Sequence, residues 1–264
     1  MIPHNKRSYI YRIQSTSFKF RLNLYFRVFL KNIITTKKYT AKQGATLVLK
    51  SYLAVWVFYL TFFTVIGVLS IWFPDLVNNE YKQERLTDML NNQPFQLIIS
   101  AVIIAPIFEE MMFRSLIRPS YEDILLFISG WLSFSFMYFS AGIANWYIRF
   151  LIMIGLFVAI YYLLQEVVSR KHLSTIQRLL NKQVITVLLI SSVIFGMAHI
   201  YNYVDSFLLN VALFTLIIPR IILGLVAGWL KLKTGVLLWP ILLHFVNNAF
   251  VIVIMLFLKY AFIT

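Results

Sequence analysis

The sequence predicts an all-α fold, a polytopic transmembrane helical bundle of about seven spans. Hydrophobic residues make up 60% of the 264-residue chain and charged residues only 13%. A single soluble domain could not hold this balance without exposing much of its apolar surface. Apolar runs of about twenty residues, the length that crosses a bilayer as a helix, begin near Tyr52, Phe95, Ile124, Tyr147, Val184, Phe207 and Val236.

The stretch from Ile124 to Gln165 allows two interpretations, either two spans or one span with a re-entrant piece. The first span follows a basic leader at residues 1–50, which has no acidic residue because the first acid of the chain is Asp75. Between Ser8 and Ile34 the leader mixes aromatic and aliphatic residues with Lys and Arg. This mixture is typical of an N-terminal interfacial amphipathic helix on anionic lipid. It disfavours a nucleic-acid arm, so we expect membrane lipids and no nucleic acid as partners.

The chain therefore divides into three parts: the leader at residues 1–50, a first span with a polar loop at residues 51–94, and a core at residues 95–264. Positive charge indicates the orientation of the bundle. In a seven-span arrangement, the leader and the later basic positions fall on one side, which should be cytoplasmic: Arg114, Arg118, Arg170, Lys171, Arg178, Lys182, Lys231 and Lys233. We expect a cytoplasmic N-terminus and an external C-terminus.

Two adjacent acidic residues interrupt the second apolar run. Glu109 and Glu110 lie between Phe95 and Ile117, and Arg114 follows four residues after Glu110. Residues at positions i and i+4 share a helix face, so Arg114 can neutralise Glu110, while Glu109 points about 100° away. Buried ionisable residues in a membrane indicate a functional site, and desolvation suits Glu109 to act as a general base. The alternative is a structural clamp between helices.

Two further apolar segments carry polar residues at helical spacing. Phe195 and His199 share a face, and so do His244 and Asn248 in the last span. Taken alone, His199 is more often a packing or interfacial residue, and the pair of His244 and Asn248 is more often a helix-to-helix hydrogen-bonding contact. Arg220, after Pro219 in the sixth span, could meet Glu110, line a water-filled cavity or extend to the interface. We assign Arg220 no catalytic role.

Taken together, these motifs resemble the CPBP family of intramembrane proteases, named for CAAX proteases and bacteriocin-processing enzymes. The family pattern is E-E-x-x-x-R, then F-x-x-x-H, then H-x-x-x-N or H-x-x-x-B, and the resemblance covers Phe95 to Leu258. The segment before the third motif is also similar: Gly224, Gly228, Lys233-Thr234-Gly235 and Trp239-Pro240. The sequence departs from the family at Ser115, where many members have glycine. The spacing between the first two motifs is also long, as an inserted pair of spans would explain.

The resemblance implies a membrane endopeptidase that acts on a peptide or on a prenylated or otherwise lipidated protein. Carried over by position, Glu109 would be the general base, Glu110 with Arg114 would hold the scaffold, and His199 would bind or orient the water. His244 and Asn248 would stabilise the oxyanion of the tetrahedral intermediate. The family and the basic leader together suggest a bacterial inner (cytoplasmic) membrane.

A role for a metal is open at this stage. Without any cysteine the chain can have neither a thiol nucleophile nor a Cys-ligated zinc site. Glu109, His199 and His244 could hold a divalent ion such as zinc, but the helical H-E-x-x-H pattern is absent. We favour a glutamate that activates water unaided. Two alternatives to an enzyme stay open: a non-catalytic bacteriocin immunity or membrane scaffold protein, and a small-solute transporter that uses the same residues as a relay.

Overall fold

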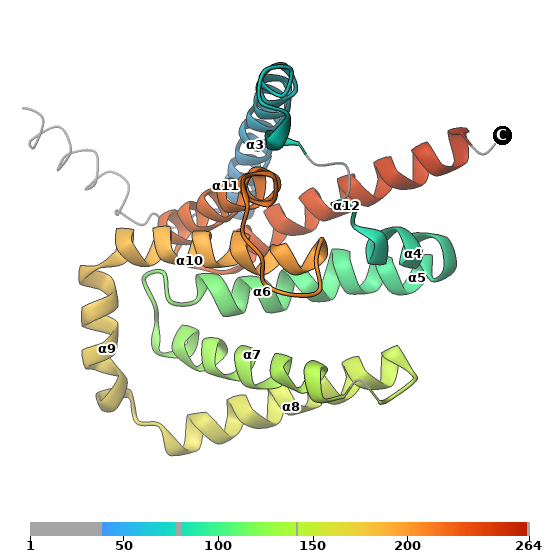
Figure 1. Cartoon of the computed structure of the whole chain (residues 1–264). Coiled ribbons are helices and arrows are strands. Elements are labelled where there is room, and N and C mark those ends of the chain that lie inside the picture. The colour runs from blue at the N-terminus through green and yellow to red at the C-terminus, as the bar shows by residue number, and fades with distance from the viewer. Residues whose placement is uncertain (1–38, 78–80, 141, 263–264) are drawn as a thin grey trace, which may run out of the picture.

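The structure, a computed structural model, describes residues 39–77, 81–140 and 142–262. These residues form helices joined by short loops, with no strand among them (Figure 1). The predicted interfacial helix from Ser8 to Ile34 lies outside the described residues. The helices in chain order are α3 Ala41–Leu69, the 3₁₀ turn η1 Pro74–Leu76, α4 Glu84–Asn92, α5 Pro94–Leu97, the π-helix η2 Ile98–Ile104, α6 Ala105–Arg114, α7 Tyr121–Phe139, α8 Trp146–Val167, α9 Arg170–Lys182, α10 Val184–Ala198, the 3₁₀ turn η3 His199–Asn202, α11 Val211–Thr234 and α12 Leu238–Phe262.

Six helical segments of this part of the chain are long and apolar enough to cross a membrane: Ala41–Leu69, Pro94–Arg114, Trp146–Val167, Val184–Asn202, Val211–Thr234 and Leu238–Lys259. The remaining predicted span, which begins near Ile124, corresponds to α7, a 19-residue helix with Glu122 and Asp123 in its first turn. Helices α7 and α8 pack against each other, so the segment from Ile124 to Gln165 forms two helices, of which α8 is one of the six candidate spans (Figure 1). The prediction of an all-α bundle with about seven spans is thus confirmed.

Capping residues set the ends of several helices. Thr40 and Gln43 form a capping box that begins α3 at Ala41, ahead of the apolar run that starts near Tyr52. Ser120 and Asp123 form a second capping box at the start of α7. Helix α11 ends at Gly235, which adopts the left-handed conformation that glycine tolerates best (φ 78°). These signals place the helix ends independently of hydropathy.

The basic ends of the helices meet at one side of the bundle. Lys231 Nζ, near the end of α11, donates to both carboxylate oxygens of Asp123 at the start of α7, each at 2.8 Å, and to the Gly235 carbonyl at 3.0 Å. Arg170 at the start of α9 pairs with Glu122 of α7 at 2.9 Å. Helix α9 runs along one end of the bundle, from the end of α8 to the start of α10 (Figure 1). Lys231 and Arg170 of the predicted basic set thus lie on one side, whereas Arg114 is buried beside Glu110, and the orientation stays a prediction.

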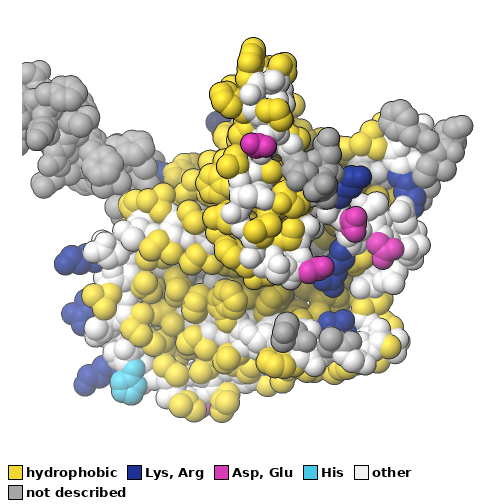
Figure 2. Space-filling model, viewed as in Figure 1, with side chains coloured by type: hydrophobic (Ala, Val, Ile, Leu, Met, Phe, Trp, Pro, Cys, Tyr) yellow, Lys and Arg dark blue, Asp and Glu magenta, His cyan; other side chains and the backbone are white. Residues whose placement is uncertain are grey.

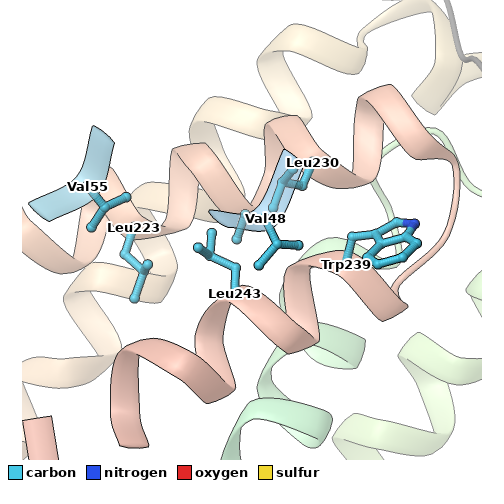
Figure 3. Close-up of a cluster of buried hydrophobic side chains, with 7 residues drawn as sticks. Val48, Val55, Leu223, Leu230, Trp239 and Leu243 are labelled. Atoms are coloured by element: carbon cyan, nitrogen blue, oxygen red, sulfur yellow. The ribbon is translucent and has the colours of Figure 1, made fainter. Parts of the chain in front are cut away.

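The apolar surface is largely exposed, as expected for helices surrounded by lipid. In Figure 2, hydrophobic side chains cover much of the visible face, Lys and Arg side chains stand along its left edge, and Asp and Glu side chains lie in its upper and right-hand part with further Lys and Arg. Inside the bundle, one cluster joins α3, α11 and α12 through Val48, Val55, Leu223, Ala227, Leu230, Trp239 and Leu243 (Figure 3). A Cβ on Gly44 would overlap the Trp239 ring, so glycine allows α3 to approach α12 this closely.

Candidate active site

The two adjacent glutamates project from α6, where they face different neighbours. Glu110 is buried at the centre of the bundle, and Arg114 Nε lies 3.2 Å from Glu110 Oε2. The side chain of Glu109 keeps 22% of its surface exposed. Its Oε2 atom is itself buried and accepts no hydrogen bond from any described residue. The predicted ion pair of Glu110 with Arg114 is therefore present, whereas Glu109 Oε2 has no Lys or Arg partner among the described residues.

Arg114 is enclosed by aromatic rings and by a glycine. Its Cζ atom lies 4.3 Å from the ring centre of Phe195 and 5.8 Å from that of Phe113, both within cation–π range. A Cβ on Gly224 of α11 would lie 3.2 Å from Arg114 Nη2 and 3.2 Å from the Phe195 ring. Glycine at position 224 therefore leaves the space that the guanidinium occupies, which explains one of the small residues of α11.

His244 of α12 contacts both glutamates. Its Nδ1 lies 2.9 Å from Glu110 Oε1, and its Nε2 lies 3.8 Å from Glu109 Oε2. Because a carboxylate so paired with Arg114 is an acceptor, Nδ1 carries the hydrogen. The sequence did not indicate this second contact of Glu110, since it joins residues far apart in the chain. Glu110 thus links Arg114 to His244 and orients the imidazole.

His199 approaches Glu109 from the other side. It is the first residue of η3, where α10 gives way to a tighter turn. Its Nδ1 lies 2.7 Å from the Phe195 carbonyl oxygen, which can only accept, so the hydrogen sits on Nδ1 and the lone pair on Nε2. Nε2 lies 3.9 Å from Glu109 Oε2. The Phe195 ring also packs edge-on against both imidazoles, with ring centres 4.6 Å from His199 and 5.6 Å from His244.

The Asn248 side chain lies one turn beyond His244 on α12. Its Nδ2 donates to the Ala101 carbonyl of η2 at 2.8 Å, and its Oδ1 accepts from Asn247 Nδ2 at 3.2 Å. Sequence reasoning missed both partners, although Pro106, which follows η2, was a visible signal of an irregular helix. The amide is therefore engaged with the backbone of the helix that carries Glu109.

Arg220 stays apart from Glu110. It is half-buried on α11, donates to the Leu216 carbonyl at 3.2 Å and lies over the Tyr203 ring at 5.4 Å. It is near enough to Glu109 and His199 to interact with them electrostatically. Of the three roles that the sequence left open for Arg220, contact with Glu110 is not found.

The three candidate metal ligands converge, but with wide spacing. A tetrahedral zinc site has ligand atoms about 3.4 Å apart, whereas Glu109 Oε2 lies 3.9 Å and 3.8 Å from the two imidazole Nε2 atoms. Within the described ranges, no group of three or more His, Asp or Glu side chains is arranged to hold a metal ion. The arrangement does not fit a metal as it stands.

Residues 91–250 match the family described as type II CAAX prenyl endopeptidase Rce1-like. The match includes all six predicted site residues and begins close to the proposed start of the core at residue 95. No curated protein and no solved structure shows significant similarity to the chain.

Proposed function

Because the chain belongs to the Rce1-like family of type II CAAX prenyl endopeptidases, we propose that it hydrolyses a peptide bond of a membrane-associated or lipidated peptide with water activated by Glu109. The family and the six apolar helices make the chain an integral membrane protein of the CAAX protease type. One observation carries the mechanism. A buried, unpartnered oxygen of Glu109 faces the Nε2 atoms of two histidines at 3.8 and 3.9 Å.

In this proposal, Glu109 removes a proton from the attacking water. The Nε2 lone pair of His199 accepts a hydrogen bond from the other O–H of that water. This hydrogen bond directs the water oxygen toward the scissile carbonyl. A new C–O bond forms while the carbonyl oxygen becomes an oxyanion. Collapse of this intermediate breaks the C–N bond, and Glu109 gives its proton to the leaving amine. The fixed Nδ1 tautomer of His199 supports this role because it leaves Nε2 free to accept.

His244 stabilises the oxyanion in the same proposal. Glu110 accepts from its Nδ1 and is itself paired with Arg114, so Nδ1 is held as a donor. An imidazolium that donates Nδ1–H to Glu110 still offers Nε2–H to the oxyanion. Glu110 and Arg114 then orient His244 without touching the substrate. They are positioning residues.

Peptide cleavage by the purified chain in lipid vesicles tests the assignment. The probe is a fluorogenic peptide that ends in a prenylated CAAX sequence. Glu109→Gln should lower cleavage by about a hundredfold or more, the usual contribution of a general base. Glu122→Gln, an exposed glutamate outside the site, is the matched control and should keep its activity. Binding of the peptide without cleavage by the wild-type chain would favour the binding-only alternative, and cleavage that survives Glu109→Gln would contradict the mechanism.

We propose that no metal takes part in the reaction, which the wide ligand spacing supports. Cleavage should then survive dialysis against a chelator. Loss of cleavage on dialysis, with recovery on adding zinc, would show instead that Glu109, His199 and His244 close around an ion.

We also propose a bacterial cytoplasmic membrane with the N-terminus inside, supported by the basic residues gathered at one end of the bundle. The chain has no cysteine, so single substitutions such as Lys171→Cys on α9 can be probed with membrane-impermeant thiol reagents. Labelling of Lys171→Cys in whole cells would contradict the orientation, whereas labelling only after lysis would support it.

A further inference from the structure

The carbonyl of Ala101 lacks a donor from its own helix. In an α-helix it would accept from the N–H of residue 105, and in a π-helix from residue 106. The Ala105 N–H bonds instead to the Ser100 carbonyl, and residue 106 is a proline, which has no N–H. The change from η2 to α6 therefore leaves an acceptor unsatisfied at membrane depth, which is costly where water is scarce.

Asn248 supplies the missing donor from another helix. Its Nδ2 lies 2.8 Å from the Ala101 oxygen. The orientation of the amide follows from its partners, because the carbonyl can only accept and Asn247 donates to Asn248 Oδ1 at 3.2 Å. This hydrogen bond ties α12 to the irregular helical segment that leads into α6.

The hydrogen bond between Asn248 and Ala101 lies next to the candidate catalytic groups on both helices. Glu109 follows Pro106 by three residues, and His244 precedes Asn248 by one helical turn. The same two helices also meet where His244 contacts Glu110 and approaches Glu109. Loss of the Asn248 contact would therefore free α6 to shift against α12 close to the site, where a displacement of about 1 Å can cost a hundredfold in rate.

We propose that Asn248 is a positioning residue that replaces the donor removed by Pro106 and so holds Glu109 in place against His244. The contact with Ala101 uses one of the two hydrogens on Asn248 Nδ2, so this positioning role is separate from donation to an oxyanion. This inference rests on the proposed function for its catalytic consequence, and on hydrogen-bond geometry alone for its structural part.

A double-mutant cycle with Pro106 separates the two roles of Asn248. Pro106→Ala restores an N–H to the helix, which can then satisfy Ala101. The positioning role predicts that Asn248→Ala lowers kcat by about a hundredfold or more in the wild-type background, and by at least about tenfold less in the Pro106→Ala background. A residue that acted only as an oxyanion donor would instead cost the same factor, about 10²- to 10³-fold, in both backgrounds. That equal loss would overturn the inference.

Thermal unfolding of the same four proteins in detergent tests the inference without any activity. Asn248→Ala should lower Tm in the wild-type background and change it much less in the Pro106→Ala background. Asn247→Ala, which removes the neighbouring amide but leaves the Ala101 contact, should lower Tm equally in both. An equal drop for Asn248→Ala in the two backgrounds would contradict the inference. A wild-type chain that cleaves nothing would instead refute the proposed function, and the Tm cycle would still decide the role of Asn248.

Discussion

Replacement of Arg114 by methionine should destabilise the fold far more than the same replacement in an exposed ion pair. The Arg114 side chain is 0% exposed, and its removal leaves the buried Glu110 carboxylate with the hydrogen bond from His244 Nδ1 but without its arginine. Breaking a buried pair costs about 3–5 kcal/mol. The contact between Arg114 Nε and Glu110 falls short of hydrogen-bond geometry. Methionine also keeps a favourable contact with the Phe195 ring. Both facts favour the lower end of the range, about 3 kcal/mol.

Arg170 provides the matched control for this substitution. It also pairs with a glutamate, Glu122, but the two side chains are 74% and 44% exposed. Such pairs contribute about 0–1 kcal/mol, so Arg170→Met should change stability little. The assay is the free energy of unfolding in mixed detergent micelles. The double variant Glu110→Gln with Arg114→Met should recover part of the loss, because no uncompensated charge remains. Equal effects of Arg114→Met and Arg170→Met, within about 1 kcal/mol, would refute the reasoning.

Two further substitutions test packing and charge around the site. A Cβ on Gly196 would overlap Ile221, so Gly196→Ala should lower the free energy of unfolding by about 1–3 kcal/mol. It should also lower kcat, because it moves His199. The control is Gly155→Ala, which has no atom within 4 Å of the added Cβ and should leave stability unchanged or slightly raised. Lys231→Met leaves the buried Asp123 carboxylate unpaired and should cost about 3 kcal/mol, as measured by unfolding, whereas the double variant with Asp123→Asn should recover most of the loss.

Local patterns in the sequence were sufficient for some contacts. The spacing of Glu110 and Arg114 predicts their pairing, because residues four apart share a helix face whatever surrounds the helix. The apolar runs predict the spans because the length and hydropathy of a run are also local properties of the sequence. The start of α3 at Ala41 was missed because hydropathy alone was followed, although Thr40 and Gln43 form a recognisable capping box.

Contacts between distant segments could not be derived from local spacing. His199 and His244 approach the same carboxylate oxygen of Glu109 because of the way α10 and α12 pack against α6. Only the family resemblance predicted this approach. The Asn248 contact with Ala101 was not predicted at all, because it depends on the π-helix before Pro106 and on the register of α12 against that segment. Helical periodicity does not encode such a register.

A single turnover in ¹⁸O-labelled water tests the central claim, that Glu109 activates water for direct attack. With enzyme in excess over the fluorogenic CAAX peptide, the new carboxylate of the product should carry one ¹⁸O atom in the first turnover, because the attacking oxygen comes from solvent. Transfer of ¹⁶O from the enzyme in that turnover, with the label appearing only later, would show that Glu109 attacks the carbonyl itself and would contradict the account.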